Sequence, residues 1–312
     1  MTKISRVLDS VVLGEETTAG TEASSYNVSV FGDILNCTLT TEHAKKLIPG
    51  MRGGTTQGHL PTKIIDLKAT PTGSMTFHPS TLMFLKYVIS DYTSDASSYT
   101  LANRSIDSAK SLSIKGNYDN SNGLSQFGAY MTNVRFSIAD EDILSVSADL
   151  KSLYSKTNTD TVEYVAPTDE PLTYIGSTFT VSGTEWDLQS LNITFDPKMI
   201  QKFGMNTKTV GRENFPSDII RGGKCGISFD GVANVNDITD EIEVVWGGTS
   251  PQITTSELTL ILNFEDVTGN NHTITMTGKF SKLDVLESDS EENSKTFSFS
   301  GVGIDFSVAG EI

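Results

Sequence analysis

The sequence LNITFD at residues 191–196 alternates apolar and polar side chains, with the apolar ones at Leu191, Ile193 and Phe195. Strict alternation with a period of two is typical of a strand that buries one face. The same pattern recurs in other segments, at residues 134–138, 258–264, 273–277 and 296–300. The sequence therefore predicts a mainly β fold whose strands each have one polar face.

Helical patterns are rare. Residues 79–89 begin with a proline and carry apolar residues at i, i+3 and i+7, which predicts a short helix. Residues 237–242, DITDEI, predict a second short helix with Asp237 as its N-cap. Residues 41–47 are expected to form one or two helical turns.

The segment at 191–196 has an earlier counterpart, LNCTL at residues 35–39, at an offset of 156. Three further matches follow in the same order in each half of the chain: 60–65 with 215–220, 75–77 with 227–229, and 130–136 with 275–280. Ordered matches at a nearly constant offset indicate an internal duplication. The sequence predicts two copies of one β unit, over residues 1–160 and 161–312.

A long polar loop follows the same strand in each predicted unit, at residues 49–59 and 204–214. Both exceed the connection of about 4–6 residues that is usual between elements. Both carry basic residues although the chain is acidic, so we expect them to be functional. The candidate contact residues are Arg52, Gly53, Gln57 and His59 in the first loop and Lys208, Arg212 and Glu213 in the second.

The chain has 312 residues, 39 acidic and 23 basic, and a formal net charge of −16. Residues 1–156 carry a net charge of −1, and the remainder carries −15. This balance argues against a protein that binds nucleic acid through phosphate contacts, and against binding to an acidic membrane surface. No apolar run approaches about 18 residues and no signal peptide is evident, so we expect a soluble protein made in a cytoplasm.

Chemistry-bearing residues do not form a recognisable site. The four histidines lack metal-ligand spacing, and neither Cys37 nor Cys225 is close in sequence to any of them. Cys37 takes the place of Ile193 on an apolar face, so we expect it in the core. The acidic clusters at 237–243 and 284–292 do not follow a calcium-loop pattern. We therefore expect no enzyme, no cofactor and no metal site.

The segment LGEETTAGTE at residues 13–22 resembles the start of the tail tube proteins of long-tailed bacteriophages. The strand GSMTF at 73–77, followed by the helix expected at 79–89, resembles the strand and helix that succeed each other in that family. The Gly- and Arg-rich loop before this strand fits as well. The resemblance covers most of the chain in order, and departs where the acidic segment 236–246 replaces the helix of the second unit.

The resemblance implies two tandem tail-tube-like β-sandwich or barrel units, each with a short flanking helix and a long loop. Subunits of that family join edge to edge into rings around a lumen, and the rings stack through terminal arms and the long loop. The loop candidates would then make inter-ring contacts. An acidic lumen would let DNA slide without sticking, and Asp196, Glu257 and Glu265 are its candidate acids.

The duplication favours a trimeric ring with pseudo-six-fold symmetry over a hexameric ring. A hexamer would follow if the second unit lay outside the tube. The partners implied are further copies of this chain, the tape measure, the tail terminator, baseplate or tip proteins, and viral DNA in transit, with no membrane. The location implied is the virion tail, assembled in the host cytoplasm.

Two other classes of function remain open for this sequence. One is a two-domain β-sandwich adhesin or receptor-binding module, which would usually need a secretion signal and aromatic residues at its loop tips. The other is an enzyme on a β scaffold, which would need a nucleophile, metal or acid/base motif. Negative-stain microscopy of the purified protein separates these classes, because only a tube protein is expected to form rings or hollow tubes.

Overall fold

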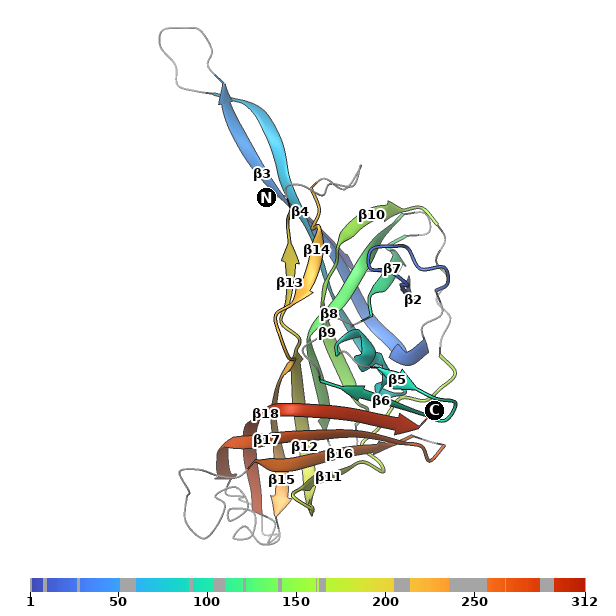
Figure 1. Ribbon diagram of the computed structural model, residues 1–312, viewed down its shortest axis with the longest axis vertical. Coiled ribbons are helices and arrows are strands. Elements are labelled where there is room, and N and C mark those ends of the chain that lie inside the picture. The colour runs from blue at the N-terminus through green and yellow to red at the C-terminus, as the bar shows by residue number, and fades with distance from the viewer. Residues whose placement is uncertain are drawn as a thin grey trace.

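The computed structural model describes residues 2–7, 10–26, 29–50, 60–89, 92–103, 110–119, 122–139, 142–160, 162, 167–204, 214–235, 257–266, 268–286 and 295–311. These residues form antiparallel strands and two short 3₁₀ helices, and this part of the chain contains no α-helix (Figure 1). The prediction of a mainly β fold is confirmed.

The first half of the chain contains both 3₁₀ helices and ten of the described strands. These strands are β1 (Thr2–Val7), β2 (Ser10–Glu15), β3 (Asp33–Gly50), β4 (Leu60–His78), β5 (Thr93–Ser94), β6 (Ser98–Ala102), β7 (Leu112–Asn117), β8 (Gly123–Ala139), β9 (Ser145–Lys151) and β10 (Tyr154–Asn158). The 3₁₀ helices are η1 (Ser29–Phe31) and η2 (Leu82–Tyr87).

The described residues of the second half form eight strands, and six of these close a barrel. The eight strands are β11 (Thr178–Val181), β12 (Thr184–Asp196), β13 (Met199–Lys202), β14 (Asp218–Arg221), β15 (Gly226–Val235), β16 (Leu258–Glu265), β17 (Asn271–Leu286) and β18 (Lys295–Glu311). The barrel runs β12–β11–β16–β17–β18–β15 and returns to β12. Its core is aromatic, with Phe179, Trp186 and Phe299 in mutual ring contact.

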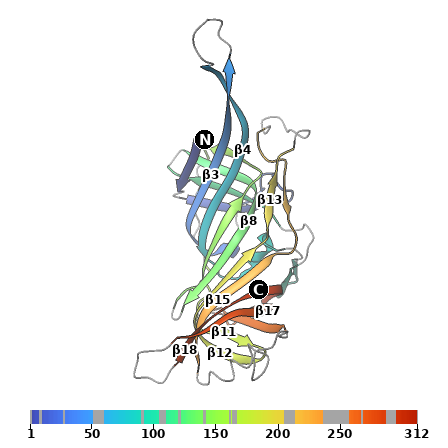
Figure 2. The same cartoon turned by 90° about the vertical axis from the view of Figure 1, so that its left-hand side faces the viewer.

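One sheet continues from the first half into the second. Its order is β3–β4–β9–β8–β12–β15–β18–β17, and we call it the eight-strand sheet. Pairing of β8 with β12 joins the two halves. Figure 2 shows β3, β4, β8 and β15 one after another across the side that faces the viewer.

Strand β8 can serve both halves because it changes partners along its length. Residues 123–129 pair with β7 or β10, and later residues pair with β9 and β12. Near the change of partners Gly128 has φ +61°, and Asn133 has φ +48° at a register shift against β9. Such left-handed residues and bulges bend a strand and re-aim it.

In the first half, β2, β7 and η2 form a second layer that covers the apolar face of the sheet (Figure 1). Between the layers Phe31, Phe77, Phe84, Tyr87 and Phe136 form a chain of ring contacts with centroids 5.0–6.2 Å apart. Edge-to-face and offset aromatic pairs of this kind add to the stabilisation by burial.

Three helical expectations meet different outcomes. Residues 79–89 yield only η2, because Leu82, Phe84, Leu85 and Tyr87 are all buried and the segment packs on every side instead of on one helical stripe. The expectation of helical turns at 41–47 is wrong. Those residues lie in β3 and pair with β4, whose long-range hydrogen bonds override a weak local preference. The helix expected at 237–242 lies outside the described residues.

Strands β1 to β10 all precede residue 160, and β11 to β18 all follow it. The six-strand barrel is built from the second group alone. The division into units at 1–160 and 161–312 stays a prediction, and the eight-strand sheet crosses it. Cys37 is 2% exposed, which confirms its predicted place in the core.

Candidate functional site

Residues directly opposite one another form a row across all strands of the eight-strand sheet. The row is Asn36, Thr76, Ser147, Arg135, Thr194, Ser228, Val302 and Lys279, each exposed or half-buried. The next row is Ile34, Phe77, Val146, Phe136, Ile193, Phe229, Gly301 and Phe280, which lies against the core. The sheet therefore keeps one polar and one apolar face from its first strand to its last.

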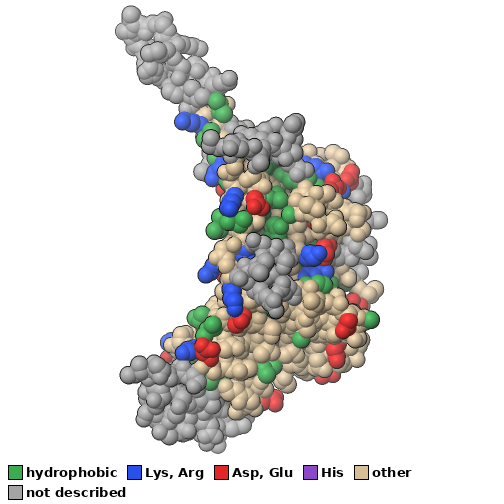
Figure 3. Space-filling model, in the orientation of Figure 1, with side chains coloured by type: hydrophobic (Ala, Val, Ile, Leu, Met, Phe, Trp, Pro, Cys, Tyr) green, Lys and Arg blue, Asp and Glu red, His purple; other side chains and the backbone are tan. Residues whose placement is uncertain are grey.

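The polar face consists mainly of short hydroxyl and amide side chains. Besides the row above it includes Thr38, Ser74, Ser145, Ser137, Asn192, Ser298 and Ser300. In Figure 3 the left-hand side of the molecule is hollowed, and Figure 2 turns that side to the viewer. The eight-strand sheet thus lines a concave polar surface.

Charged residues on this face carry both signs. The basic ones are Arg135, Lys151, Lys279 and Lys282, and the acidic ones are Asp149, Asp196, Asp230 and Asp284. Several are engaged locally: Lys282 pairs with Asp284, and the Nδ2 of Asn192 donates to Asp230 at 3.0 Å. The described part of the face is therefore polar without a strong field of one sign.

The structure does not bring the three predicted lumen acids together. Asp196 ends β12 on the polar face, where its side chain is exposed and accepts a hydrogen bond of 2.9 Å from the backbone N–H of Lys198. Glu257 and Glu265 are exposed at the two ends of β16. That strand belongs to the barrel but not to the eight-strand sheet.

The predicted loop contacts Arg52, Gly53, Gln57, His59, Lys208, Arg212 and Glu213 lie outside the described residues. The strands that lead to them form two antiparallel hairpins, β3 with β4 and β13 with β14. In Figure 1 the end of the β3–β4 hairpin projects well beyond the rest of the body. The described ends of β3 and β4 thus lie away from the core.

Two strand edges match the junction between the halves. At that junction, residues 134–139 of β8 pair with residues 190–195 of β12, while β7 pairs only with the earlier part of β8. Similarly, β16 pairs with β17 only up to Gly278, and among the described strands residues 279–286 pair with β18 alone. At the opposite end of the sheet, the outer side of β3 pairs, within the described residues, only with β1, over residues 38–43.

Both edges carry the sequence of the junction. The RFS of residues 135–137 in β8 recurs as KFS at residues 279–281 in β17. The LNITF of residues 191–195 in β12 recurs as LNCTL at residues 35–39 in β3. The duplication thus supplies a second copy of each half of the β8–β12 junction, at opposite ends of one sheet. The matches were visible in the sequence, but the edges they mark required the strand pairing.

Leu35 lies on the part of the β3 edge that no described strand covers, and it makes that edge apolar. Its side chain is 58% exposed at a register shift between β3 and β4. Leu191, at the matching sequence position, is 1% exposed and pairs with Ile138 of β8. Sequence reasoning missed this difference because the two leucines are alike until their burial is known. A large exposed apolar residue at a strand edge favours contact with another protein surface.

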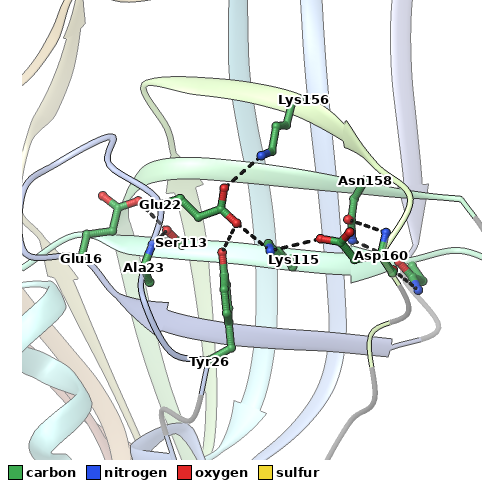
Figure 4. A network of polar contacts seen from close by, with 10 residues as sticks. Glu16, Glu22, Ala23, Tyr26, Ser113, Lys115, Lys156, Asn158 and Asp160 are labelled. Carbon is green, nitrogen blue, oxygen red and sulfur yellow. Dashed lines mark hydrogen bonds and ion pairs between the residues drawn. The ribbon is translucent and has the colours of Figure 1, made fainter.

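Figure 4 shows a charged network that holds the segment after β2 against β7 and β10. The carboxylate of Glu22 accepts hydrogen bonds from Lys115 Nζ at 2.6 Å and from Lys156 Nζ at 3.0 Å. Lys115 Nζ also lies 3.3 Å from Asp160. The hydrogen bond from Lys115, with that from Lys156, lowers the pKa of Glu22 to about 2. The lysines and carboxylates satisfy one another, so the network is a structural clamp.

A buried carboxylate lies beside this clamp. Glu16 is 3% exposed and accepts four hydrogen bonds of 2.8 Å. The donors are the backbone N–H groups of Gly20 and Gly128 and the hydroxyls of Ser111 and Ser113. Because buried charges need such partners, Glu16 fixes the turn after β2 to β7 and to the bend in β8.

A pocket of about 940 Å³ is lined by residues of β11, β12 and β16 and of the segment before β11. Tyr174, Ile175, Trp186 and Leu262 form much of its apolar wall. The described lining residues include two carboxylates but no histidine, lysine or arginine. The two carboxylates are therefore the only charged groups in the described lining of the pocket.

The described residues contain no group of three or more His, Cys, Asp and Glu side chains placed to hold a metal ion. Within the same residues, no helix has the length and apolar character needed to cross a membrane. No protein-family model matches the sequence, and no curated protein matches it significantly.

Proposed function

We propose that this chain is a structural subunit that polymerises into stacked rings and forms the tail tube of a tailed bacteriophage. The observation that carries the proposal is the eight-strand sheet, which runs through both halves of the chain and keeps one polar, concave face. The resemblance of residues 13–22 and 73–77 to tail tube proteins supports the same function. On this proposal the chain is not an enzyme and needs no cofactor.

A ring of three chains accounts for the sheet better than a ring of six. The second half contributes β12, β15, β18 and β17 to the same sheet to which the first contributes β3, β4, β9 and β8. A second half that only decorated the outside of a tube would not continue the sheet in this way. Two equivalent halves in each of three chains give pseudo-six-fold symmetry in a closed cyclic assembly.

The polar face suits a channel through which DNA slides. Its serine, threonine and asparagine side chains hydrogen-bond water, and its charged residues carry both signs. Proteins that grip DNA instead cluster lysine and arginine along the phosphates. The net charge of −16 adds long-range repulsion of phosphate. We propose that viral DNA passes through the lumen without specific binding.

The proposed partners are further copies of the chain within the virion tail, with the tape measure, the tail terminator and baseplate or tip proteins. Assembly takes place in the host cytoplasm and involves no membrane. The loops at 49–59 and 204–214 are the proposed ring-to-ring contacts. The β3–β4 hairpin supports this role, because it projects from the body as an arm would that reaches a neighbouring ring (Figure 1).

Negative-stain electron microscopy of the purified chain tests the proposal. We expect rings and hollow tubes, and class averages of end-on rings with three protruding repeats. Discrete monomers at every protein and salt concentration tried would contradict it. In that case binding of the monomer to bacterial cells or surface polysaccharide would favour the adhesin.

A further inference from the structure

We propose that residues 279–284 of β17 pair with the edge of β3 in a neighbouring copy, in the register of the junction between β8 and β12. The inference rests on the proposed self-assembly, and it names the partner surface and the register. Residue by residue, Lys279 lies opposite Thr38 of the neighbouring copy, and Phe280 lies opposite its Cys37.

The β8–β12 junction shows what such a pairing contains. Arg135 lies opposite Thr194 on the polar face, and Phe136 lies opposite Ile193 on the apolar face. The ring of Phe136 also contacts Phe195 of β12, with centroids 5.1 Å apart. The junction therefore joins the polar surfaces and the cores of the two halves at once.

The register follows from the two sequence matches. Lys279 and Phe280 correspond to Arg135 and Phe136, at an offset of 144. Thr38 and Cys37 correspond to Thr194 and Ile193, at an offset of 156. Replacing each junction residue by its match converts the pair Arg135–Thr194 into Lys279–Thr38. It also converts Phe136–Ile193 into Phe280–Cys37.

The facing of the side chains agrees with this register. Lys279 and Thr38 are exposed or half-buried on the polar face, whereas Phe280 packs against the barrel core and Cys37 is buried. A shift of one residue would place Lys279 opposite Cys37 and break both faces, because side chains alternate along a strand. Polar and apolar rows thus continue from one copy into the next.

Leu35 gives the pairing an apolar contribution. Its side chain lies at the end of the β3 edge that no described strand covers, and it is 58% exposed. In the proposed register this edge faces residues 282–283 of β17, where Leu283 already packs partly against the barrel core. Covering Leu35 would reproduce the burial of Leu191 beneath β8.

Strand β1 leaves room for the neighbouring copy. In the proposed register residues 279–284 of β17 lie opposite residues 38–33 of β3, and β1 covers residues 38–43. Only Val7, opposite Thr38, occupies a position that β17 would need. The other five β1 residues in the register, Thr2 to Arg6, pair further along β3 and can stay in place.

Engineered disulfides test the register. The variant Lys279→Cys/Thr38→Cys places the two thiols opposite each other across the proposed junction, within disulfide range. The matched in-chain variant is Arg135→Cys/Thr194→Cys, which makes the same pair at the β8–β12 junction. The off-strand control is Lys279→Cys/Ser74→Cys, because Ser74 is exposed and lies one strand beyond Thr38.

Assembled protein is oxidised, separated on a non-reducing gel, and its linked peptides are identified by mass spectrometry. We expect dimers and closed trimers bridged between residues 279 and 38, at least tenfold more abundant than in the off-strand control. The in-chain variant should give a bridge within a single chain. Peptide identification excludes bridges to the native Cys37 and Cys225.

Each other outcome has a definite meaning. Rings that form without the 279–38 bridge, while the in-chain bridge forms, would overturn the junction and leave the proposed tube function standing. A bridge in the off-strand control of equal yield would also overturn the register. Folded monomers with no rings in any variant or in the unmodified protein would overturn both proposals.

Discussion

At the scale of single residues, Glu22 predicts how stability depends on pH. Its hydrogen bonds to Lys115 and Lys156 hold its folded pKa at about 2, below its usual value of 4.5. A depressed carboxyl pKa stabilises the fold above the unfolded pKa, and that contribution is lost as pH falls from about 4.5 towards 2. Because the carboxylate is partly exposed, the contribution is modest.

The variant Glu22→Gln should therefore melt about 2 °C below the unmodified protein at pH 7. The difference should shrink as pH falls through the range 4.5 to 2, because the carboxylate of the unmodified protein is then protonated. Melting followed by circular dichroism measures both proteins. Glu170→Gln, at an exposed carboxylate, is the control and should leave Tm unchanged. A difference independent of pH would rule out the ion pair as its source.

Some individual residues were predictable from sequence and others were not. The alternation at 191–196 placed Leu191, Ile193 and Phe195 in the core, and the repeat placed Cys37 there too. The local sequence gave no such signal for the position of Asp196 on the polar face or for the exposure of Leu35. Whether an acid lines a concave face, or a leucine stays exposed, depends on which strands pair beside it, and that information is not local.

At the scale of elements, the bend in β8 predicts the cost of altering Gly128. Its φ of +61° is strained for any residue with a Cβ, and an added Cβ would lie 2.6–2.9 Å from the side chain of Leu153. Gly128→Ala should therefore cost about 2–5 kcal/mol from strain and overpacking together. Thermal or urea unfolding measures the loss.

Gly183 supplies the matched control for this prediction. It has φ +90° in the turn between β11 and β12, with nothing within 4 Å of an added Cβ. Gly183→Ala should cost only the strain, about 1–2 kcal/mol. In a Leu153→Ala background the cost of Gly128→Ala should fall towards that figure. An unchanged cost in that background would show that the contact with Leu153 is not responsible.

Elements with strong alternation were predictable, and those decided by long-range contacts were not. The segment TEHAKKL at residues 41–47 has no clear strand pattern of its own and becomes strand because β4 lies beside it. The spacing at 79–89 predicted a helix, but i, i+3 spacing also fits a 3₁₀ helix buried among aromatic rings.

At the scale of the whole molecule, the net charge of −16 predicts that salt promotes assembly. Copies of like charge repel one another. Raising the ionic strength from about 0.01 M to 0.1 M shortens the Debye length from about 30 Å to about 10 Å. The protein concentration at which rings or tubes first form should therefore fall several-fold over that range. Analytical ultracentrifugation measures it, and a rise with salt would contradict the role assigned to repulsion.

The closure of the barrel and the sheet shared by both halves were beyond prediction from the sequence. The repeat indicated two related units, but it did not say that β8 would pair with β12 or that β11 would pair with β16. Those pairings join residues far apart in the chain. The orientation of one duplicated unit against the other is likewise set by the packing of both, so no single segment encodes it.

The eight-strand sheet also fixes the calibre of any tube built from it. Strands about 4.8 Å apart make an arc of roughly 38 Å in each copy. Three arcs give a circumference of roughly 115 Å, which a strand tilt of about 40° widens to roughly 150 Å, or about 48 Å across the backbone circle. The bore therefore changes only in steps of whole strands, so substitutions on the polar face alter its lining and leave its width unchanged.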